Sequence, residues 1–222
     1  MLTDSIGRLA HPVSYWCLFL LLIFAIPTLG IPQIADEQLW ASATIQKVLT
    51  PRVDLEYEQQ IRLRDNYSTL RVSISELSLS YIILPKWKVT GAYRYERYPD
   101  EVGHRITLRA RFKDKKKKVG YSYRLQFQSE RAGGGELEKH LRNRITLRYS
   151  ILSWLAPYIQ GELFHLTSQE GMELKKYRQT IGFRFFITNA QLIKFFYREQ
   201  KKVNVKNPDI FYIIGIGYEL GI

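Results

Sequence analysis

The sequence predicts an all-β protein: a transmembrane antiparallel up-and-down β-barrel of about ten strands (10–12) that follows an N-terminal signal peptide. Three observations predict this fold. An apolar run near the N-terminus has the layout of an export signal. Apolar and polar residues then alternate with a period of two in one segment after another. The connections between these segments are short and long in turn, which is typical of membrane barrels with turns at one end and loops at the other.

The export signal lies in the first thirty residues. The apolar run SYWCLFLLLIFAIPTLG (14–30) is preceded by Arg8 and followed by small and helix-breaking residues. A spanning helix needs about 20 apolar residues, so this shorter run favours export, with an uncleaved membrane anchor as the alternative. We therefore assign residues 1–30 to a signal peptide, with cleavage between residues 30 and 35. Cys17, the only cysteine, lies inside this segment, so the mature chain would have no cysteine for a disulfide or a metal site.

The alternating segments begin at residue 53 and define the barrel, which we assign to residues 53–222. In RITLRARF (105–112), for example, every second residue is apolar and the residues between them are Arg or Thr. The segments are 8 to 13 residues long, close to the length of about nine to eleven residues that a tilted strand needs to cross a bilayer. The ten segments are 53–64, 77–84, 87–96, 105–112, 119–127, 141–151, 157–164, 177–186, 191–199 and 210–222.

The connections between these segments fall into two classes that alternate strictly along the chain. We expect the short ones on the periplasmic side and the long ones outside the cell. The short ones are TPR (50–52), LPK (84–86), KDKKKK (113–118), LSW (152–154) and ITNA (187–190). The long ones are 65–71, 97–104, 129–140, 165–176 and 200–209.

Two stretches leave the strand count open. LWASATIQKVL (39–49) would be an eleventh strand, whereas an even number returns the C-terminus to the periplasm. We assign residues 31–52 to an N-terminal segment that contains this additional strand, placed in the lumen or over the periplasmic end. A twelfth strand within 66–84 is the alternative, because the apolar phase there changes between Ile74 and Leu77, which indicates a bulge or an extra turn.

A soluble, lipocalin-like barrel with its apolar face inside and its arginines outside would show the same alternation. Three features favour the membrane barrel: the two classes of connection, the many tyrosines on apolar faces near strand ends, and a last strand that runs to the final residue. We therefore expect the protein in the outer membrane.

Several segments together resemble a family of uncharacterised bacterial outer-membrane barrels, domain of unknown function 2490. The resemblance covers Trp40 to the C-terminus. It rests on Trp40 and Lys47 and on EYEQQIRLRDN (56–66), LSLSYIILPKWKVTGAYRYE (77–96), HRITLRARF, LRNRITLRYS, PYIQGELF and KKYRQTIGFRF (175–185). It implies an outer-membrane barrel; it implies no activity, because the family has none assigned.

The polar face carries many arginines and few acids, and we expect it to line the lumen. Arg–carboxylate pairs in a narrow barrel would form an inert plug and make the protein a structural or adaptor barrel. If a water path remains, the surplus of arginine would instead make a narrow channel that favours anions. The predicted lumen-lining residues are Arg62, Arg64, Arg94, Glu96, Arg105, Arg109, Arg111, Arg124, Arg142, Arg144, Arg148, Glu162, Arg178, Arg184 and Arg198.

An enzyme acting on lipid or peptide is the alternative function. His104, His140 and His165 all fall at the external ends of predicted strands, where a catalytic site could form. Polar residues gather in loops in any case, and no fixed spacing of catalytic or metal-binding residues supports the enzyme. We therefore predict no catalytic residue, no metal and no cofactor.

The expected partners follow from location and charge. They are outer-membrane lipid, the barrel-assembly machinery and lipopolysaccharide phosphates, which Arg105, Arg142, Arg144 and Arg178 could bind near the long loops. Nucleic acid is not expected despite the net charge of +12, because the tyrosines lie on the face opposite the arginines. The run Lys115 to Lys118 is predicted to be a turn. The sequence leaves the oligomeric state open.

Overall fold

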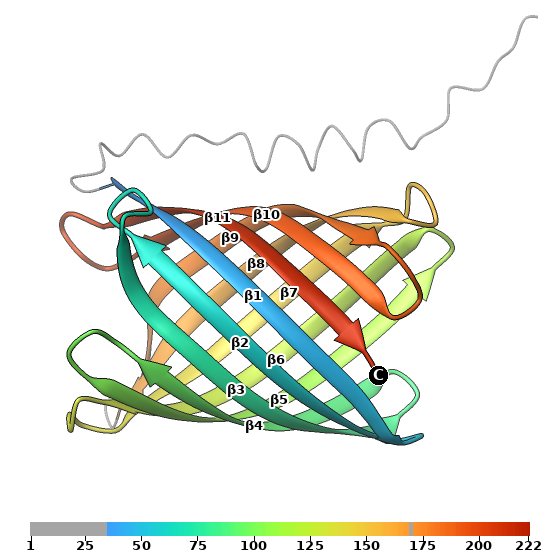
Figure 1. Cartoon of the computed structure of the whole chain (residues 1–222). Coiled ribbons are helices and arrows are strands. Elements are labelled where there is room, and N and C mark those ends of the chain that lie inside the picture. The colour runs from blue at the N-terminus through green and yellow to red at the C-terminus, as the bar shows by residue number, and fades with distance from the viewer. Residues whose placement is uncertain (1–34, 169–170) are drawn as a thin grey trace, which may run out of the picture. The chain divides into compact units, whose positions relative to one another are not determined.

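The computed structural model describes residues 35–168 and 171–222 (Figure 1). The predicted signal peptide, residues 1–30 with cleavage between 30 and 35, lies outside the described residues. Within the part that is described, no helix is long and apolar enough to cross a membrane.

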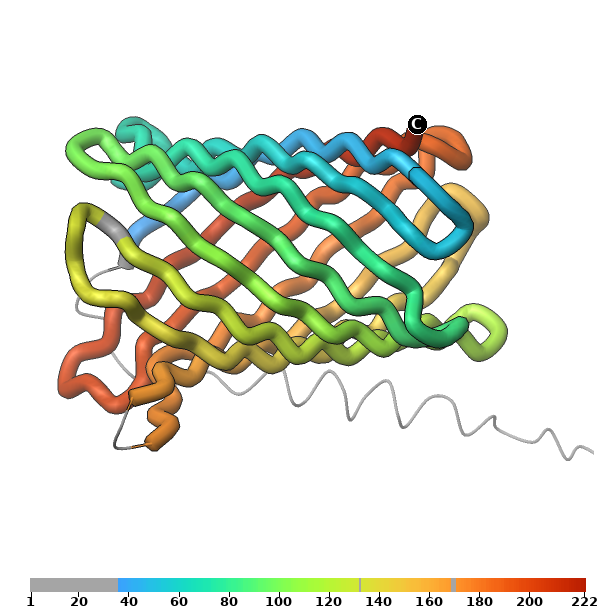
Figure 2. Tube along the Cα trace, turned by 90° about the horizontal axis from the view of Figure 1, so that it is seen from below, coloured from blue at the N-terminus to red at the C-terminus, as the bar shows by residue number. Residues whose placement is uncertain are grey.

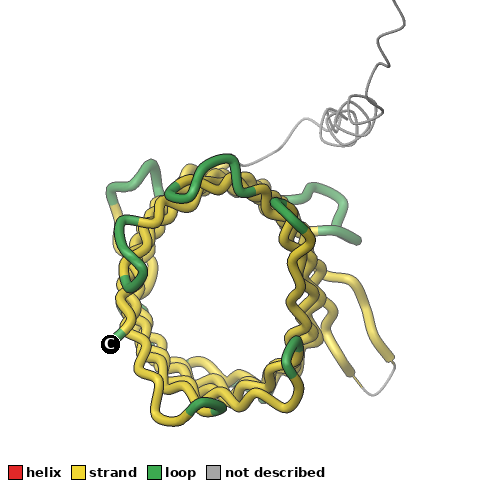
Figure 3. Tube along the Cα trace, turned by 90° about the vertical axis from the view of Figure 1, so that its right-hand side faces the viewer, coloured by secondary structure: helices red, strands yellow, loops and turns green. Residues whose placement is uncertain are grey.

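In these residues, eleven strands form one closed barrel. Each strand pairs with its neighbours in sequence in the antiparallel sense, and β1 pairs with β11 to close the ring. Figure 3 looks into this ring, with the connections gathered at its rims. The strands are β1 (Ala35–Thr50), β2 (Val53–Arg64), β3 (Thr69–Leu84), β4 (Trp87–Arg97), β5 (Val102–Lys116), β6 (Val119–Ala132), β7 (Glu138–Tyr149), β8 (Leu155–Ser168), β9 (Gly171–Phe186), β10 (Gln191–Lys202) and β11 (Ile210–Gly221).

The alternation in the sequence is the alternation between the two faces of the wall. In β5, Ile106 is 67% exposed and Leu108 is 57% exposed, whereas Thr107 between them is 2% exposed. Successive side chains of a strand point to opposite faces, so the apolar set is on the outside and the polar set is inside. This confirms the membrane-type barrel and is opposite to the lipocalin-like arrangement, in which the apolar face would be buried.

The additional strand expected in 39–49 is β1, and it lies in the wall rather than in the lumen or over an end. Its parallel register with β11 runs from Ala35 opposite Ile210 to Gln46 opposite Gly221. Because the first and last strands run in the same direction, an odd number of strands closes the ring. The expectation of an even number therefore fails for these residues.

The stretch 66–84 holds one strand, β3, and no additional turn within it. Ile74 is fully buried, whereas Leu77 is 51% exposed, so the two residues lie on opposite faces of a regular strand. The apolar phase changes here because Ile74 faces the lumen. The bulge expected between them is absent from the described strand, whose register shifts lie at its two ends, opposite Arg62/Leu63 and at Ile82/Leu84.

The two ends of the barrel differ. We call the end with connections 51–52, 85–86, 117–118, 150–154 and 187–190 the turn end. The opposite end, with connections 65–68, 98–101, 133–137, 169–170 and 203–209, is the loop end. The described chain starts at the loop end and finishes at the turn end (Figures 1 and 2).

The strict alternation of short and long connections is not maintained in the structure. Strands extend into the predicted long loops; for example, β8 and β9 stay paired as far as Ser168 and Gly171. Only the second half of the lysine run is a turn: Lys117, with a φ of 52°, and Lys118 connect β5 to β6. Lys115 and Lys116 extend β5 and lie opposite Gly120 and Val119, so the prediction of a turn over Lys115 to Lys118 is wrong for these two residues.

A charge on the outer face should destabilise the barrel according to its depth in the bilayer. We expect Leu108→Arg, in the middle of β5, to lower the free energy of unfolding by about 2–4 kcal/mol in lipid vesicles. Val119→Arg, at the turn end of β6, is the matched control and should cost about 0–1 kcal/mol. Denaturant titration followed by tryptophan fluorescence measures both, and equal effects would contradict a lipid-facing outer surface.

Candidate functional site: the arginine-lined lumen

The register of the strands places almost all of the predicted lumen residues inside the barrel. Arg64 is the exception: it lies at the rim where β2 ends, with half of its side chain exposed, and pairs with Asp65 at 3.4 Å. The residues on the inner face are Arg62, Arg94, Glu96, Arg105, Arg109, Arg111, Arg124, Arg142, Arg144, Arg148, Glu162, Arg178, Arg184 and Arg198.

Glu162 has more ion-pair partners than any other carboxylate among the described residues. It lies on β8 and is 2% exposed. Its cross-strand neighbours are Arg144 on β7 and Arg178 on β9. The distances from guanidinium nitrogen to carboxylate oxygen are 2.9 Å for Arg142, 3.0 Å for Arg144, 3.6 Å for Arg178 and 3.7 Å for Arg124. One carboxylate therefore faces four cations, and the cluster keeps a surplus of positive charge.

A second cluster surrounds Glu76 on β3, which is 3% exposed. Its carboxylate pairs with Arg94 Nε on β4 at 2.5 Å and with the Arg109 guanidinium on β5. Arg94 also lies 3.7 Å from Glu96, which in turn pairs with Arg105 at 3.1 Å. Buried carboxylates are thus held by arginines from several strands, a geometry that ties neighbouring strands together.

Aromatic rings complete the packing in this part of the lumen. The Arg62 guanidinium lies 3.9 Å from the ring centroid of Trp40, and Arg198 lies 5.0 Å from it. Arg142 and Arg178 lie 4.3 and 4.5 Å from the centroid of Phe164. Both rings are nearly buried, at 3% and 4% exposure. Arginine over an aromatic face is favourable, most of all where water is excluded.

Sequence reasoning missed this aromatic layer, because it assigned apolar residues to the lipid face. One signal was available: Gly215 and Gly217 occupy the inner face of β11, where side chains from other strands need room. A Cβ atom on Gly215 would lie 2.0 Å from the Phe196 ring, so glycine is required for this ring to pack against β11.

A cavity of about 550 Å³ occupies the lumen towards the turn end and reaches the rim at Asp114 and Tyr121. Among the described residues that line it, nine are basic and three are acidic. The basic ones are Lys88, Arg109, Arg111, Lys113, Arg124, Arg144, Arg148, Arg184 and Lys194, and the acidic ones are Glu56, Asp114 and Glu219.

Some of these cations are paired with a carboxylate, whereas four have no ion-pair partner among the described residues. Lys194 pairs with Glu219, and Lys88 pairs with Asp54. Within residues 35–168 and 171–222, no carboxylate lies within ion-pair distance of Arg111, Lys113, Arg148 or Arg184. The cavity therefore presents an unbalanced positive surface to whatever enters from the turn end.

The three histidines do not form one site. His104 lies on the outer face of β5, where its Nδ1 is 2.7 Å from the Tyr93 hydroxyl and its ring packs on Tyr93 and Tyr95. His165 is opposite Leu141, also on the outer face, whereas His140 faces the lumen. This arrangement does not support the predicted alternative of an enzyme built on them.

Arg105, Arg142, Arg144 and Arg178 point into the lumen, where each pairs with Glu96 or Glu162. Their charge is therefore directed inward. The expected contacts with lipopolysaccharide phosphates and with the barrel-assembly machinery stay predictions.

The family model described as "Protein of unknown function (DUF2490)" matches residues 37–210. None of the curated proteins matches the sequence. Several solved structures are similar in fold. "NanC porin structure in rhombohedral crystal form" has a TM-score of 0.54 at 10% identity, covering 84% of this chain and 99% of that one.

Two further structures are similar. "Bacterial polysaccharide outer membrane secretin" has a TM-score of 0.51 at 6% identity, over 75% of this chain and 63% of that one. "KdgM porin in complex with disordered oligogalacturonate" has a TM-score of 0.49 at 13% identity, over 83% of this chain and 96% of that one. At 10% and 6% identity, the likeness to the two structures with TM-scores of 0.54 and 0.51 shows the fold alone, which is that of a porin-like barrel.

Removing the negative charge of Glu162 should destabilise the barrel. We expect Glu162→Gln to lower the free energy of unfolding by about 3–5 kcal/mol, because four buried guanidinium groups lose their shared counter-charge. Glu173→Gln, which removes an exposed partner of Lys175, is the control and should cost about 1 kcal/mol or less. Denaturant titration in lipid vesicles measures both; similar values for the two variants would show that the cluster is not structural.

Proposed function

We propose that this chain, which belongs to the family described as Protein of unknown function (DUF2490), is an outer-membrane barrel that forms a narrow, anion-selective channel. Large apolar side chains on the outer face support the membrane location: Ile106, Leu108, Ile145 and Ile181 are all more than half exposed to the surroundings of the barrel. A closed ring with an apolar exterior pairs all the backbone groups of the wall and meets lipid favourably.

The observation that carries the proposal is the charge of the turn-end cavity, with nine basic and three acidic residues along its described lining. The cavity is enclosed by a barrel wall of low dielectric, which focuses this positive potential and raises the local concentration of anions. Rings of arginine and lysine select anions in pores for the same reason. The channel therefore favours small anions over cations.

The middle of the barrel sets the constriction. Glu162, Arg142, Arg178 and Trp40 are each at most 9% exposed, so side chains fill the lumen next to the cavity. A barrel of this strand number is nearly filled by its own side chains. We infer that ions cross this layer singly, between guanidinium groups, and that the conductance is small.

The second candidate function is a structural or adaptor barrel without conduction, and the same filled layer favours it. Arginines paired with Glu76 join β3, β4 and β5 from inside, and those paired with Glu162 join β6, β7, β8 and β9. Conductance separates the two candidates, because a structural barrel conducts no ions.

Purified protein in planar bilayers should conduct anions in preference to cations. We expect Arg148→Ala combined with Arg184→Ala to shift the permeability ratio towards cations, since both guanidinium groups lack a carboxylate partner among the described residues. Lys117→Ala with Lys118→Ala removes the same charge from the turn outside the cavity and should leave the ratio unchanged. Preference for anions should weaken at 1 M salt, where the Debye length is about 3 Å.

Clear cation selectivity of the unmodified protein would overturn the channel proposal. Absence of any conductance, in protein shown to be folded by its heat-dependent migration on gels, would leave the structural barrel in its place.

Trp40→Ala tests the constriction. Loss of this buried ring should raise the single-channel conductance, because Arg62 and Arg198 lose the surface on which they pack. The same change should lower the free energy of unfolding by about 3–5 kcal/mol. Trp87→Ala, which removes an outer-face ring that is 43% exposed, is the control and should not change the conductance.

A further inference from the structure

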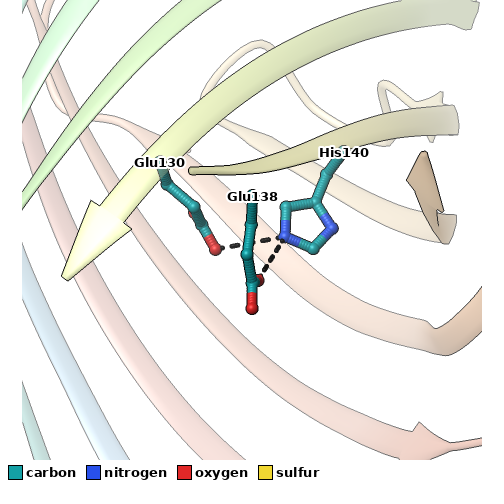
Figure 4. A group of neighbouring side chains, drawn as sticks. All are labelled: Glu130, Glu138 and His140. Atoms are coloured by element: carbon teal, nitrogen blue, oxygen red, sulfur yellow. Dashed lines mark hydrogen bonds and ion pairs between the residues drawn. The ribbon is translucent and has the colours of Figure 1, made fainter. Parts of the chain in front are cut away.

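Three side chains converge at the loop end of the β6–β7 hairpin, away from the anion cavity (Figure 4). Glu130 comes from β6, and Glu138 and His140 come from β7. The His140 Nε2 atom lies 3.0 Å from Glu138 Oε2 and 3.3 Å from Glu130 Oε1. The strand register explains the convergence, because Glu130 is directly opposite Glu138 and His140 is the next residue on the same face of β7.

The pairing of Glu130 with Glu138 is unusual in a hairpin. Carboxylates directly opposite each other on one face repel and destabilise the pair of strands. The repulsion is relieved when a cation lies between them, and here the imidazole nitrogen is directed at that position. A nitrogen donor and two carboxylate oxygens thus surround one point at the rim of the lumen.

The spacing of these donors suits a metal ion. Zinc binds imidazole nitrogen and carboxylate oxygen at about 2.0–2.2 Å in a tetrahedron, so adjacent ligands are about 3.3 Å apart. The three donor atoms lie within 4.8 Å of one another, and the two nitrogen–oxygen distances are already near this value. Mixed nitrogen and oxygen ligands favour zinc and similar transition metals over magnesium or calcium.

We propose that Glu130, Glu138 and His140 form a binding site for a divalent transition-metal ion, with Zn²⁺ as the best-suited ion. Three protein ligands leave a fourth position for water or for a ligand that arrives from the loop end.

The neighbours of Glu130 orient it for this role. Its Oε2 atom accepts a hydrogen bond from Gln128 Nε2 at 3.0 Å and pairs with Arg105 Nε, which leaves Oε1 directed at His140. Gln128 is itself buried and fixed by Gln126 and Arg142, each at 3.0 Å. Such outer contacts hold metal ligands in place in known sites. The positive charge of Arg105, which is paired with Glu130, repels a metal ion at this site. We therefore expect a moderate affinity for Zn²⁺.

A bound ion would link β6 to β7 next to the connection 133–137, where Gly133 and Gly134 have φ angles of 57° and 75°. It would therefore stabilise the loop-end rim of the barrel, independently of whether the turn-end cavity conducts anions.

Zinc titration tests the site. Protein without a histidine tag, folded in detergent and treated with EDTA, should bind one Zn²⁺ per chain in isothermal titration calorimetry. His140→Gln and Glu138→Gln should each weaken binding at least about tenfold. His104→Gln, which removes an imidazole on the outer face at the same end, is the matched control and should bind zinc like the unmodified protein. Zn²⁺ should also raise the unfolding temperature of the unmodified protein and not that of His140→Gln.

Equal zinc affinity in the unmodified protein and in His140→Gln would overturn the proposal, as would the absence of binding. Because Glu138 is exposed, Glu138→Gln is expected to fold normally, and its heat-dependent migration on gels verifies this before the titration.

Discussion

Closure of the hydrogen-bonded wall is the constraint on which the rest of this structure depends. In a bilayer, backbone groups have no water to pair with, so the last free edge of β11 must find a partner, and it finds β1. Once the ring is closed, every second side chain is directed into a narrow interior. The polar half of the sequence, with its many arginines, is therefore enclosed, and the charges must be accommodated there by pairing or by solvent.

The enclosed charges are accommodated in different ways in the middle of the lumen and at its turn end. Around Glu76, Glu96 and Glu162, buried carboxylates gather arginines from several strands, and the rings of Trp40 and Phe164 cover the remaining guanidinium faces. Towards the turn end the carboxylates are fewer, and solvent in the cavity must screen the surplus charge. The layer of paired arginines and carboxylates makes the barrel wall rigid. The unpaired basic residues of the turn-end cavity form a surface that attracts anions.

Period-two alternation was enough to predict most of the wall, because it depends only on which residues are neighbours in sequence. It predicted the inner face for Arg109, Arg124 and Arg144, and these residues line the turn-end cavity. It could not predict that β1 pairs with β11, since this register joins residues from the two ends of the chain. The rule that apolar residues face lipid also suggested a bulge or an extra turn between Ile74 and Leu77, because it did not allow Ile74 to face the lumen. It overlooked Trp40, whose environment is made by arginines on other strands. The convergence of Glu130, Glu138 and His140 was hidden for a related reason: 129–140 was expected to be a loop, whereas the strands continue into it.

The parallel seam between β1 and β11 has a consequence for the order of folding. All other pairings join strands that follow each other in sequence, so they can form as soon as both strands are present. The seam joins strands separated by nearly the whole described chain, and its entropic cost of closure is the largest in the barrel. Without this seam the wall would be a curved sheet with two free edges, and such edges are prone to pairing with other chains. Residues 210–221 close the barrel, because they supply the hydrogen-bonding partner of β1. In a chain that ends before residue 210, the edge of β1 would have no strand to pair with.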